Sequence, residues 1–126
     1  MATATASLQN YRQSPRKVRL VADLVRGKTA EHALALLSAL PKRAAEPMAK
    51  LIQSAVANAG IEGGARNLVI STIEVNSGVV FRRSMPRARG RASAIRKKSS
   101  KITLTVGPKA PKTAAKTSVA QPEEDK

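Results

Sequence analysis

The chain has 126 residues, a formal net charge of +15 and no cysteine, which excludes disulfides, thiolate zinc sites and cysteine nucleophiles. This length favours one domain with a modest hydrophobic core. So large an excess of positive charge repels itself unless a polyanion neutralises it, which makes a nucleic acid the first partner to consider.

The start of the chain, MATATASLQN, has neither an early positive cluster nor the apolar core of a secretory signal. No stretch approaches the roughly 18 apolar residues that a membrane span needs, so we expect a soluble protein. A transit segment is the weaker interpretation of this Ser/Thr/Ala-rich start, because strand-like alternation begins at Leu8 and Tyr11.

A first helix is predicted to begin where Ser14 can cap free backbone donors and Pro15 suits the first helical position. Gly27 offers a left-handed stop. The apolar stripe of this helix consists of Val18, Val21, Ala22, Leu24 and Val25. The other faces carry Arg16, Lys17, Arg19 and Arg26, so the helix is expected to bury one side and present a cationic one.

Two more helices are predicted between residues 29 and 60. Thr29 can cap the first of them, which Pro41 ends, and its apolar face is Ala33, Leu34, Leu36, Leu37 and Leu40. The next spans about 43–59, with Pro47 confined to its first turn and Gly60 as the stop. Its apolar positions are Met48, Leu51, Ile52, Ala55, Val56 and Ala59.

The pattern changes to strands after the Gly63-Gly64 pair. LVISTIEV (68–75) and KITLTV (101–106) are β-branched and alternating, so they are predicted to pair antiparallel. The roughly twenty-five residues between them exceed a hairpin turn, which leaves a disordered loop or a ribbon that continues both strands past the body. Residues 107–126 lose apolar periodicity and are predicted to form a disordered tail.

The connecting segment RRSMPRARGRASAIRKKSSK (82–101) has nine Lys or Arg side chains and no carboxylate. Arginine presents a planar fork that makes paired hydrogen bonds to phosphates, and small residues such as Ala88 and Gly90 let a backbone come close to a partner. A solvated basic loop is the ordinary alternative. The candidate RNA-binding residues of this segment are Arg82, Arg83, Arg87, Arg89, Arg91, Arg96, Lys97, Lys98 and Lys101.

The scarcity of aromatic residues limits the mode of recognition. The chain has only Tyr11 and Phe81, whereas modules that read single strands stack several bases on aromatic side chains. Contact through phosphates, 2′-hydroxyls and shape remains, and structured RNA offers narrow clefts that a thin cationic arm fits. We expect Phe81 to pack at the base of the arm.

Three stretches carry a resemblance to a known family: SPRKVRLVADLVRGK (14–28), AKLIQSAVANA (49–59), and MPRARGRASAI (85–95) followed by KITLTV. In this order they resemble the universal large-subunit ribosomal protein twenty-two family over about residues 4–106. The resemblance implies an α+β body, with three helices packed on a three-stranded antiparallel sheet whose first strand is roughly 4–12. It also implies a long protruding β-hairpin at about 78–101.

The same resemblance implies a structural function in the ribosome. We expect no enzyme activity, cofactor or metal, because the residues offer no catalytic triad, metal cluster or phosphate-cradling glycine loop. The chain would bind and join large-subunit ribosomal RNA domains during ribosome assembly, beside neighbouring large-subunit proteins and away from membranes. Its hairpin would line the exit tunnel and meet the nascent polypeptide, in a cytoplasmic or an organellar ribosome. The tip would be Met85, Pro86, Arg87, Ala88, Arg89, Gly90 and Arg91.

On this family pattern, Arg16, Lys17 and Arg19 would open the first helix as an RNA-facing surface. Two residues depart from the pattern: Lys101 stands where the family usually has histidine, and Val79 where it commonly has proline. The first retains a hydrogen-bond donor, and the second loosens a turn.

Three other functions are alternatives. A DNA-bending protein also uses basic β arms with a proline near the tip, but such arms normally come in dimers. An enzyme is disfavoured because the sequence has few candidate catalytic residues: His32 is the single histidine, and the acidic residues are scattered along the chain. A membrane-surface helix is disfavoured, because the apolar stripe of the first predicted helix has no Trp or Phe. Packing in a protein core explains this stripe better.

Overall fold

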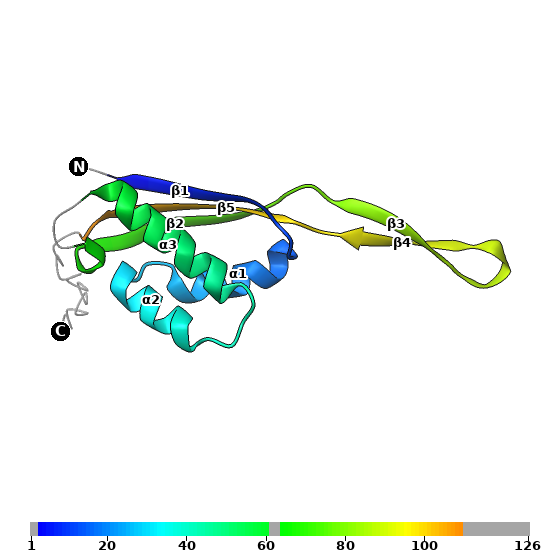
Figure 1. Ribbon diagram of the computed structural model, residues 1–126, viewed down its shortest axis with the longest axis horizontal. Coiled ribbons are helices and arrows are strands. Elements are labelled where there is room, and N and C mark those ends of the chain that lie inside the picture. Colours follow the sequence, from blue (N-terminus) through cyan, green and yellow to red (C-terminus); the bar gives the residue numbers. More distant parts are fainter. Residues whose placement is uncertain (1–2, 61–63, 110–126) are drawn as a thin grey trace, which may run out of the picture.

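The computed structural model describes residues 3–60 and 64–109 (Figure 1). Most of the expected tail, residues 110–126, lies outside this described part. Two short 3-10 turns, at Gly64–Arg66 and Ala88–Gly90, accompany the main elements. These are, in chain order, β1 (Ala4–Tyr11), α1 (Pro15–Val25), α2 (Ala30–Ala39), α3 (Ala45–Ala59), β2 (Leu68–Ser77), β3 (Phe81–Pro86), β4 (Ala92–Lys97) and β5 (Ser100–Pro108).

The body is a three-stranded antiparallel sheet of order β1-β5-β2, with the three helices packed on one of its faces (Figure 1). This is the α+β architecture that the family resemblance implied. The predicted pairing of 68–75 with 101–106 is confirmed, since Val75 lies opposite Ile102. β5 runs two residues further than expected, so Gly107 and Pro108 belong to the sheet and not to the tail.

The helix boundaries follow the predicted signals. Pro15 is the first residue of α1, and Gly60 ends α3 in the left-handed conformation with φ of 57°. Thr29 caps α2, because its hydroxyl accepts the backbone N–H of His32 at 3.4 Å. Ser14 occupies the N-cap position of α1 but its side chain makes no capping hydrogen bond, contrary to our expectation.

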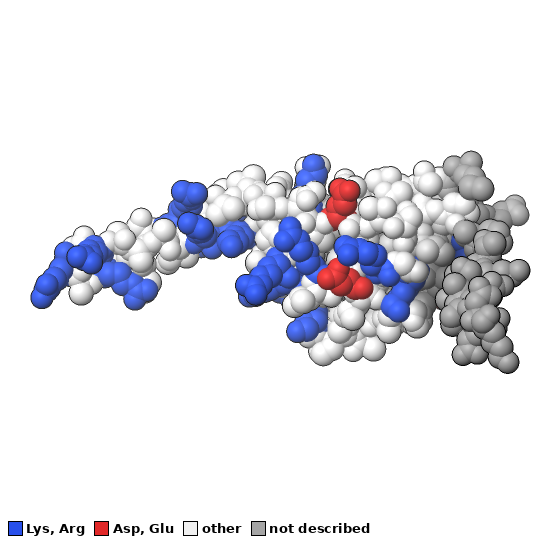
Figure 2. Space-filling view, turned by 180° about the vertical axis from the view of Figure 1, so that it is seen from behind, with Lys and Arg blue, Asp and Glu red and all other residues white. Residues whose placement is uncertain are grey.

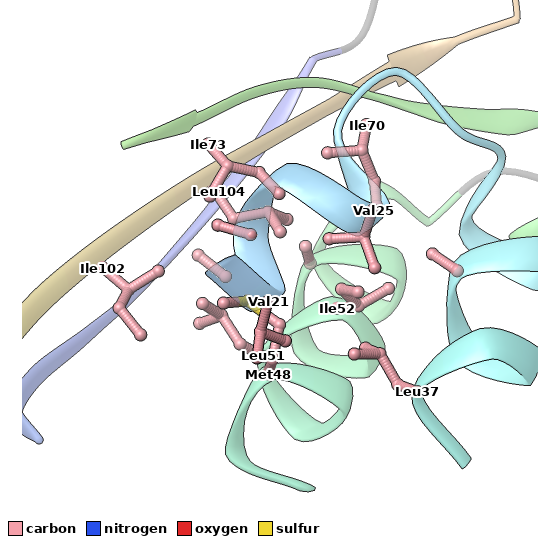
Figure 3. Packing of buried hydrophobic residues seen from close by; sticks show 14 of the residues in the cluster. Val21, Val25, Leu37, Met48, Leu51, Ile52, Ile70, Ile73, Ile102 and Leu104 are labelled. Carbon is pink, nitrogen blue, oxygen red and sulfur yellow. The ribbon is translucent and has the colours of Figure 1, made fainter. Parts of the chain in front are cut away.

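The hydrophobic core lies between the helices and the sheet. Figure 3 shows Val21 and Val25 of α1 and Ile52 of α3 pointing into the same interior as Ile70 of β2. All four are at most 2% exposed. Leu24 and Leu36, which we assigned to the apolar stripes, are 48% and 38% exposed, so the buried stripes of α1 and α2 are narrower than predicted.

The outer edge of β2 is covered by α1 and the segment that follows it. Arg19 donates from Nε and Nη2 to the Val75 carbonyl oxygen at 3.2 and 3.0 Å, and Arg26 donates to the Ile73 carbonyl oxygen at 3.1 Å. The backbone N–H of Gly27 reaches the Ile70 carbonyl oxygen at 3.2 Å. These bonds satisfy carbonyls that an uncovered edge strand would offer to other chains.

Between β2 and β5 the chain forms a separate two-stranded antiparallel sheet, β3-β4, which we call the ribbon. Of the two alternatives left open by the sequence, the structure therefore has paired strands and not a loop. The ribbon projects far beyond the body along the direction of β2 and β5 (Figure 1).

The joint between body and ribbon consists of Gly78, Val79, Ser99 and Ser100. Ser99 and Ser100 are the buried polar residues of the described chain. The Ser99 hydroxyl donates to the Val79 carbonyl oxygen, and the Gly78 N–H donates to the Ser99 carbonyl oxygen at 2.9 Å. A β-carbon at Gly78 would lie 2.8 Å from the Ser99 Oγ, so glycine is required by this close approach.

Candidate nucleic-acid interface

The ribbon exposes nearly all of its side chains, and its register places like charges together. Arg82 lies directly opposite Arg96. Like charges at directly opposed positions destabilise a strand pair, and the ribbon has no carboxylate to offset them. The arrangement is unfavourable for the free protein and becomes favourable when an anion lies between or beside the guanidinium groups.

One face of the ribbon is also partly apolar. Phe81, Met85 and Ile95 alternate in register on this face, where they are 53%, 46% and 41% exposed. A two-stranded ribbon has no second layer to bury such side chains. The exposed surface of the ribbon therefore combines arginine guanidinium groups with apolar side chains.

The tip of the ribbon is a tight turn built from the residues expected there. The Arg87 N–H donates to the Arg91 carbonyl oxygen at 2.7 Å, and the Arg87 Nε donates to the Ser93 Oγ at 3.1 Å. Arg89 and Gly90 both have positive φ, of 60° and 71°. Met85 and Pro86 end β3, and Ala88 opens the 3-10 turn. Arg89 is thus held in a conformation that is uncommon for a residue with a β-carbon.

The basic residues of α1 divide between two places. Arg16 and Lys17 are exposed in the first turn of the helix, where no acidic residue is present. Arg19, which we predicted to face RNA, is exposed as well, but it also donates from Nε and Nη2 to the Val75 carbonyl oxygen. Lys101 is exposed on β5 opposite Asn76.

A hollow of about 550 Å³ lies where the ribbon leaves the body, and we call it the basal hollow. Its walls come from the β1–α1 connection, the first turn of α1, the α2–α3 connection, and the end of β4 with the residue after it. The residues lining it are Arg12, Gln13, Ser14, Lys17, Arg43, Arg96, Lys97 and Lys98. Six of these eight carry a positive charge and none carries a negative one.

Hydrogen bonds between uncharged groups hold the walls of the basal hollow in place. The Ser100 hydroxyl donates to the Gln13 carbonyl oxygen at 2.6 Å, which ties the start of β5 to the β1–α1 connection. The Tyr11 hydroxyl donates to the Arg43 carbonyl oxygen at 3.4 Å, which ties β1 to the α2–α3 connection. These two bonds join the backbone segments that form the walls and do not neutralise the cations that line them.

A second, smaller hollow of about 360 Å³ adjoins the base of the ribbon. It is lined by Arg12, Phe81, Arg82, Arg83 and Lys97. The Arg12 guanidinium carbon lies 5.2 Å from the centre of the Phe81 ring, within the range of a cation–π contact. Phe81 therefore packs at the base of the ribbon, as expected, and the side chain that it packs against is Arg12. About half of Phe81 remains exposed.

In the part of the chain that the structure describes, the acidic side chains lie on the body and not on the ribbon. On the face shown in Figure 2, Lys and Arg follow the ribbon to its end and gather where it meets the body, whereas Asp and Glu appear on the body alone. There they form ion pairs, such as Lys50 with Glu46 at 2.9 Å and Arg66 with Glu31 at 3.4 Å. Within residues 3–60 and 64–109, no ion pair includes a residue of the ribbon or of the basal hollow.

Part of this candidate interface was predictable from the sequence. Of the predicted residues, Lys17, Arg96, Lys97 and Lys98 meet in the basal hollow, and Arg82 and Arg83 line the smaller one. Arg12 and Arg43 were missed, because each is separated in sequence from the basic segment and joins it through the fold. Within residues 3–60 and 64–109, no cluster of three His, Cys, Asp or Glu is placed to hold a metal, and no helix is long and apolar enough to cross a membrane.

Residues 6–107 match the sequence profile of the family described as ribosomal protein L22p/L17e. Curated relatives named large ribosomal subunit protein uL22 agree with this match. The protein from Herpetosiphon aurantiacus is 52% identical over 105 residues, which are 82% of this chain and 93% of the relative. Those from Pelobacter propionicus and Fusobacterium nucleatum are each 50% identical over 105 residues, covering 82% of this chain and 95% of the relative.

Proposed function

Because the chain belongs to the ribosomal protein L22p/L17e family, whose members are ribosomal proteins and not enzymes, we propose that it is a structural constituent of the large ribosomal subunit. In this role it binds large-subunit ribosomal RNA and joins RNA domains as the subunit assembles. Its further partners are neighbouring large-subunit proteins. The ribosome it serves is cytoplasmic or organellar.

The observation that carries the proposal is the ribbon itself. It presents arginine opposite arginine without a carboxylate along its length, on a strand pair that buries almost nothing. Such a surface has no stabilising role within the body. Arginine forks fit phosphate groups, and the thin cross-section of two strands suits a cleft between RNA helices.

The finer part of the proposal concerns the tip. A ribbon that reaches through folded RNA ends in a small, basic turn, Arg87–Arg91, beside the exposed Met85. We assign this end to the wall of the nascent-peptide exit tunnel, where the growing polypeptide passes it. The tight turn at Arg89 and Gly90 keeps the end narrow.

RNA binding is tested by the salt dependence of affinity for transcribed large-subunit ribosomal RNA. Each phosphate contact releases counterions and contributes roughly −0.7 to −0.9 to the slope of log affinity against log salt. Replacing Arg82, Arg83 and Arg96 by Gln is expected to make this slope less negative by about 2 to 3. A flat response of the unaltered chain would contradict the proposal, as would equal affinity for duplex DNA.

The position of the tip is tested by cryo-electron microscopy of large subunits that contain this chain. Density for residues 85–91 beside the tunnel lumen is the expected result. Density that places the ribbon on the outer surface of the particle would rule out the tunnel assignment and leave the RNA-binding proposal standing.

A further inference from the structure

The basal hollow concentrates positive charge that the fold itself does not need. Six cationic side chains line about 550 Å³, and the two hydrogen bonds that join its walls are made between uncharged groups. None of these six cations has an ion-pair partner in the described part of the chain. Close like charges repel, so the hollow is stabilised by whatever anion enters it.

The walls of the hollow come from both regions of the molecule. Arg12, Lys17 and Arg43 belong to the body, whereas Arg96 and Lys98 belong to the base of the ribbon and its link to β5. The first turn of α1 contributes further positive potential, because no acidic residue and no Ser14 side-chain bond occupies that end of the helix. An anion in the hollow therefore contacts body and ribbon together.

We propose that the basal hollow binds one stretch of RNA sugar–phosphate backbone, so that a body cation and a ribbon cation contact the same phosphate group. This inference rests on the proposed RNA-binding function. It adds the place on the protein where the backbone binds, the phosphate group that is bound, and separate roles for the basal hollow and the tip. The hollow anchors the protein at the base of the ribbon, while the tip lies beyond the anchor. Arg12 and Arg43 thereby join the RNA-binding residues.

Shared binding of a single phosphate has a measurable signature. Two cations that contact the same phosphate are coupled, so that losing the second costs less affinity once the first is gone, whereas cations on separate phosphates act additively. Arg43 and Lys98 are the pair to test, because neither side chain makes a hydrogen bond or an ion pair within the described part of the chain. Circular dichroism checks that every variant is folded.

The experiment is a double-mutant cycle on the full chain, with transcribed large-subunit ribosomal RNA from a bacterium as the probe. Arg43→Gln and Lys98→Gln are each expected to weaken binding about tenfold, and the double variant by clearly less than the hundredfold that independent contacts would give. The control is the pair Arg66→Gln and Lys50→Gln. It removes the same charges from the body surface and is expected to change affinity by less than about threefold.

The outcomes separate the two proposals. A hundredfold or greater loss in the double variant, or losses no larger than those of the Arg66 and Lys50 controls, would overturn the shared phosphate site while the chain still binds RNA. Failure of the unaltered chain to bind the RNA would instead overturn the proposed function.

Discussion

The body and the ribbon are both made of antiparallel strands, yet they are stabilised in different ways. In the body, Ile70 and Leu104 are fully buried and every strand has a neighbour or a helix against it. In the ribbon, β3 is exposed along its whole length and β4 nearly so. Burial thus explains the sequence of the body, whereas it does not explain the sequence of the ribbon.

The comparison is tested most strongly by the same substitution in both regions. Ile70→Ala removes a buried side chain and is expected to lower the free energy of unfolding by about 2–5 kcal/mol. Ile95→Ala, on the 41% exposed ribbon residue, is expected to change it by less than about 0.5 kcal/mol. Urea denaturation measures both, and equal losses would show that the ribbon packs as the body does.

The joint is expected to behave as part of the body. Gly78→Ala places a β-carbon 2.8 Å from the Ser99 Oγ, and the resulting overpacking is expected to cost about 1–3 kcal/mol of unfolding free energy. The control is Gly107→Ala, whose β-carbon would lie at an ordinary 3.6 Å from the Thr3 Cγ2. If urea denaturation gives the two variants the same stability, the close approach at the joint is not a constraint.

The two arginines of α1 provide a finer comparison. Arg19→Met removes two hydrogen bonds to the Val75 carbonyl and is expected to lower the unfolding free energy by about 1 kcal/mol. Arg16→Met, at an exposed position of the same helix, is expected to stay within about 0.5 kcal/mol of the unaltered chain. Thermal unfolding of both proteins decides this, and a larger loss for Arg16→Met would reverse the assigned roles.

The smallest effect is expected from deleting residues 84–91. The deletion joins Arg83 to Ala92. The Arg83–Ile95 pair remains, and the three residues between its two members close the shortened ribbon. Because the removed residues are exposed, the body is expected to keep its far-ultraviolet circular dichroism and its stability to within about 0.5 kcal/mol. Loss of helical signal would show that body and ribbon fold as one unit.

Local signals in the sequence were enough to place most elements of the body. Pro15 and Gly60 mark helix ends because backbone geometry restricts proline and favours glycine in the left-handed conformation. Signals that depend on tertiary packing failed: Ser14 can cap in principle but makes no such bond, and Leu24 lies on the apolar stripe yet remains half exposed. Helical periodicity gives the direction of a side chain but not how far the neighbouring element extends.

The candidate site was predictable where its charges are contiguous in sequence. The run from Arg82 to Lys98 was visible directly, whereas Arg12 and Arg43 are single basic residues in connections between elements. Only the packing of β1 and of the α2–α3 connection beside the base of the ribbon brings them to the same hollow. The role of Arg19 could not be inferred either, since it depends on which carbonyls of the β2 edge lack a strand partner.

The alignment of the ribbon with β2 and β5 has a mechanical consequence. Both strands leave the body at the same end, at Ser77 and Ser100, and continue into the ribbon. A pull on the tip therefore acts along the direction of β2 and β5. It would slide β5 past β1, and it would slide β2 past Arg19 of α1 and Arg26 directly after this helix. Sliding strains many hydrogen bonds at once, whereas peeling breaks them one after another, so the molecule is built to resist tension from its far end.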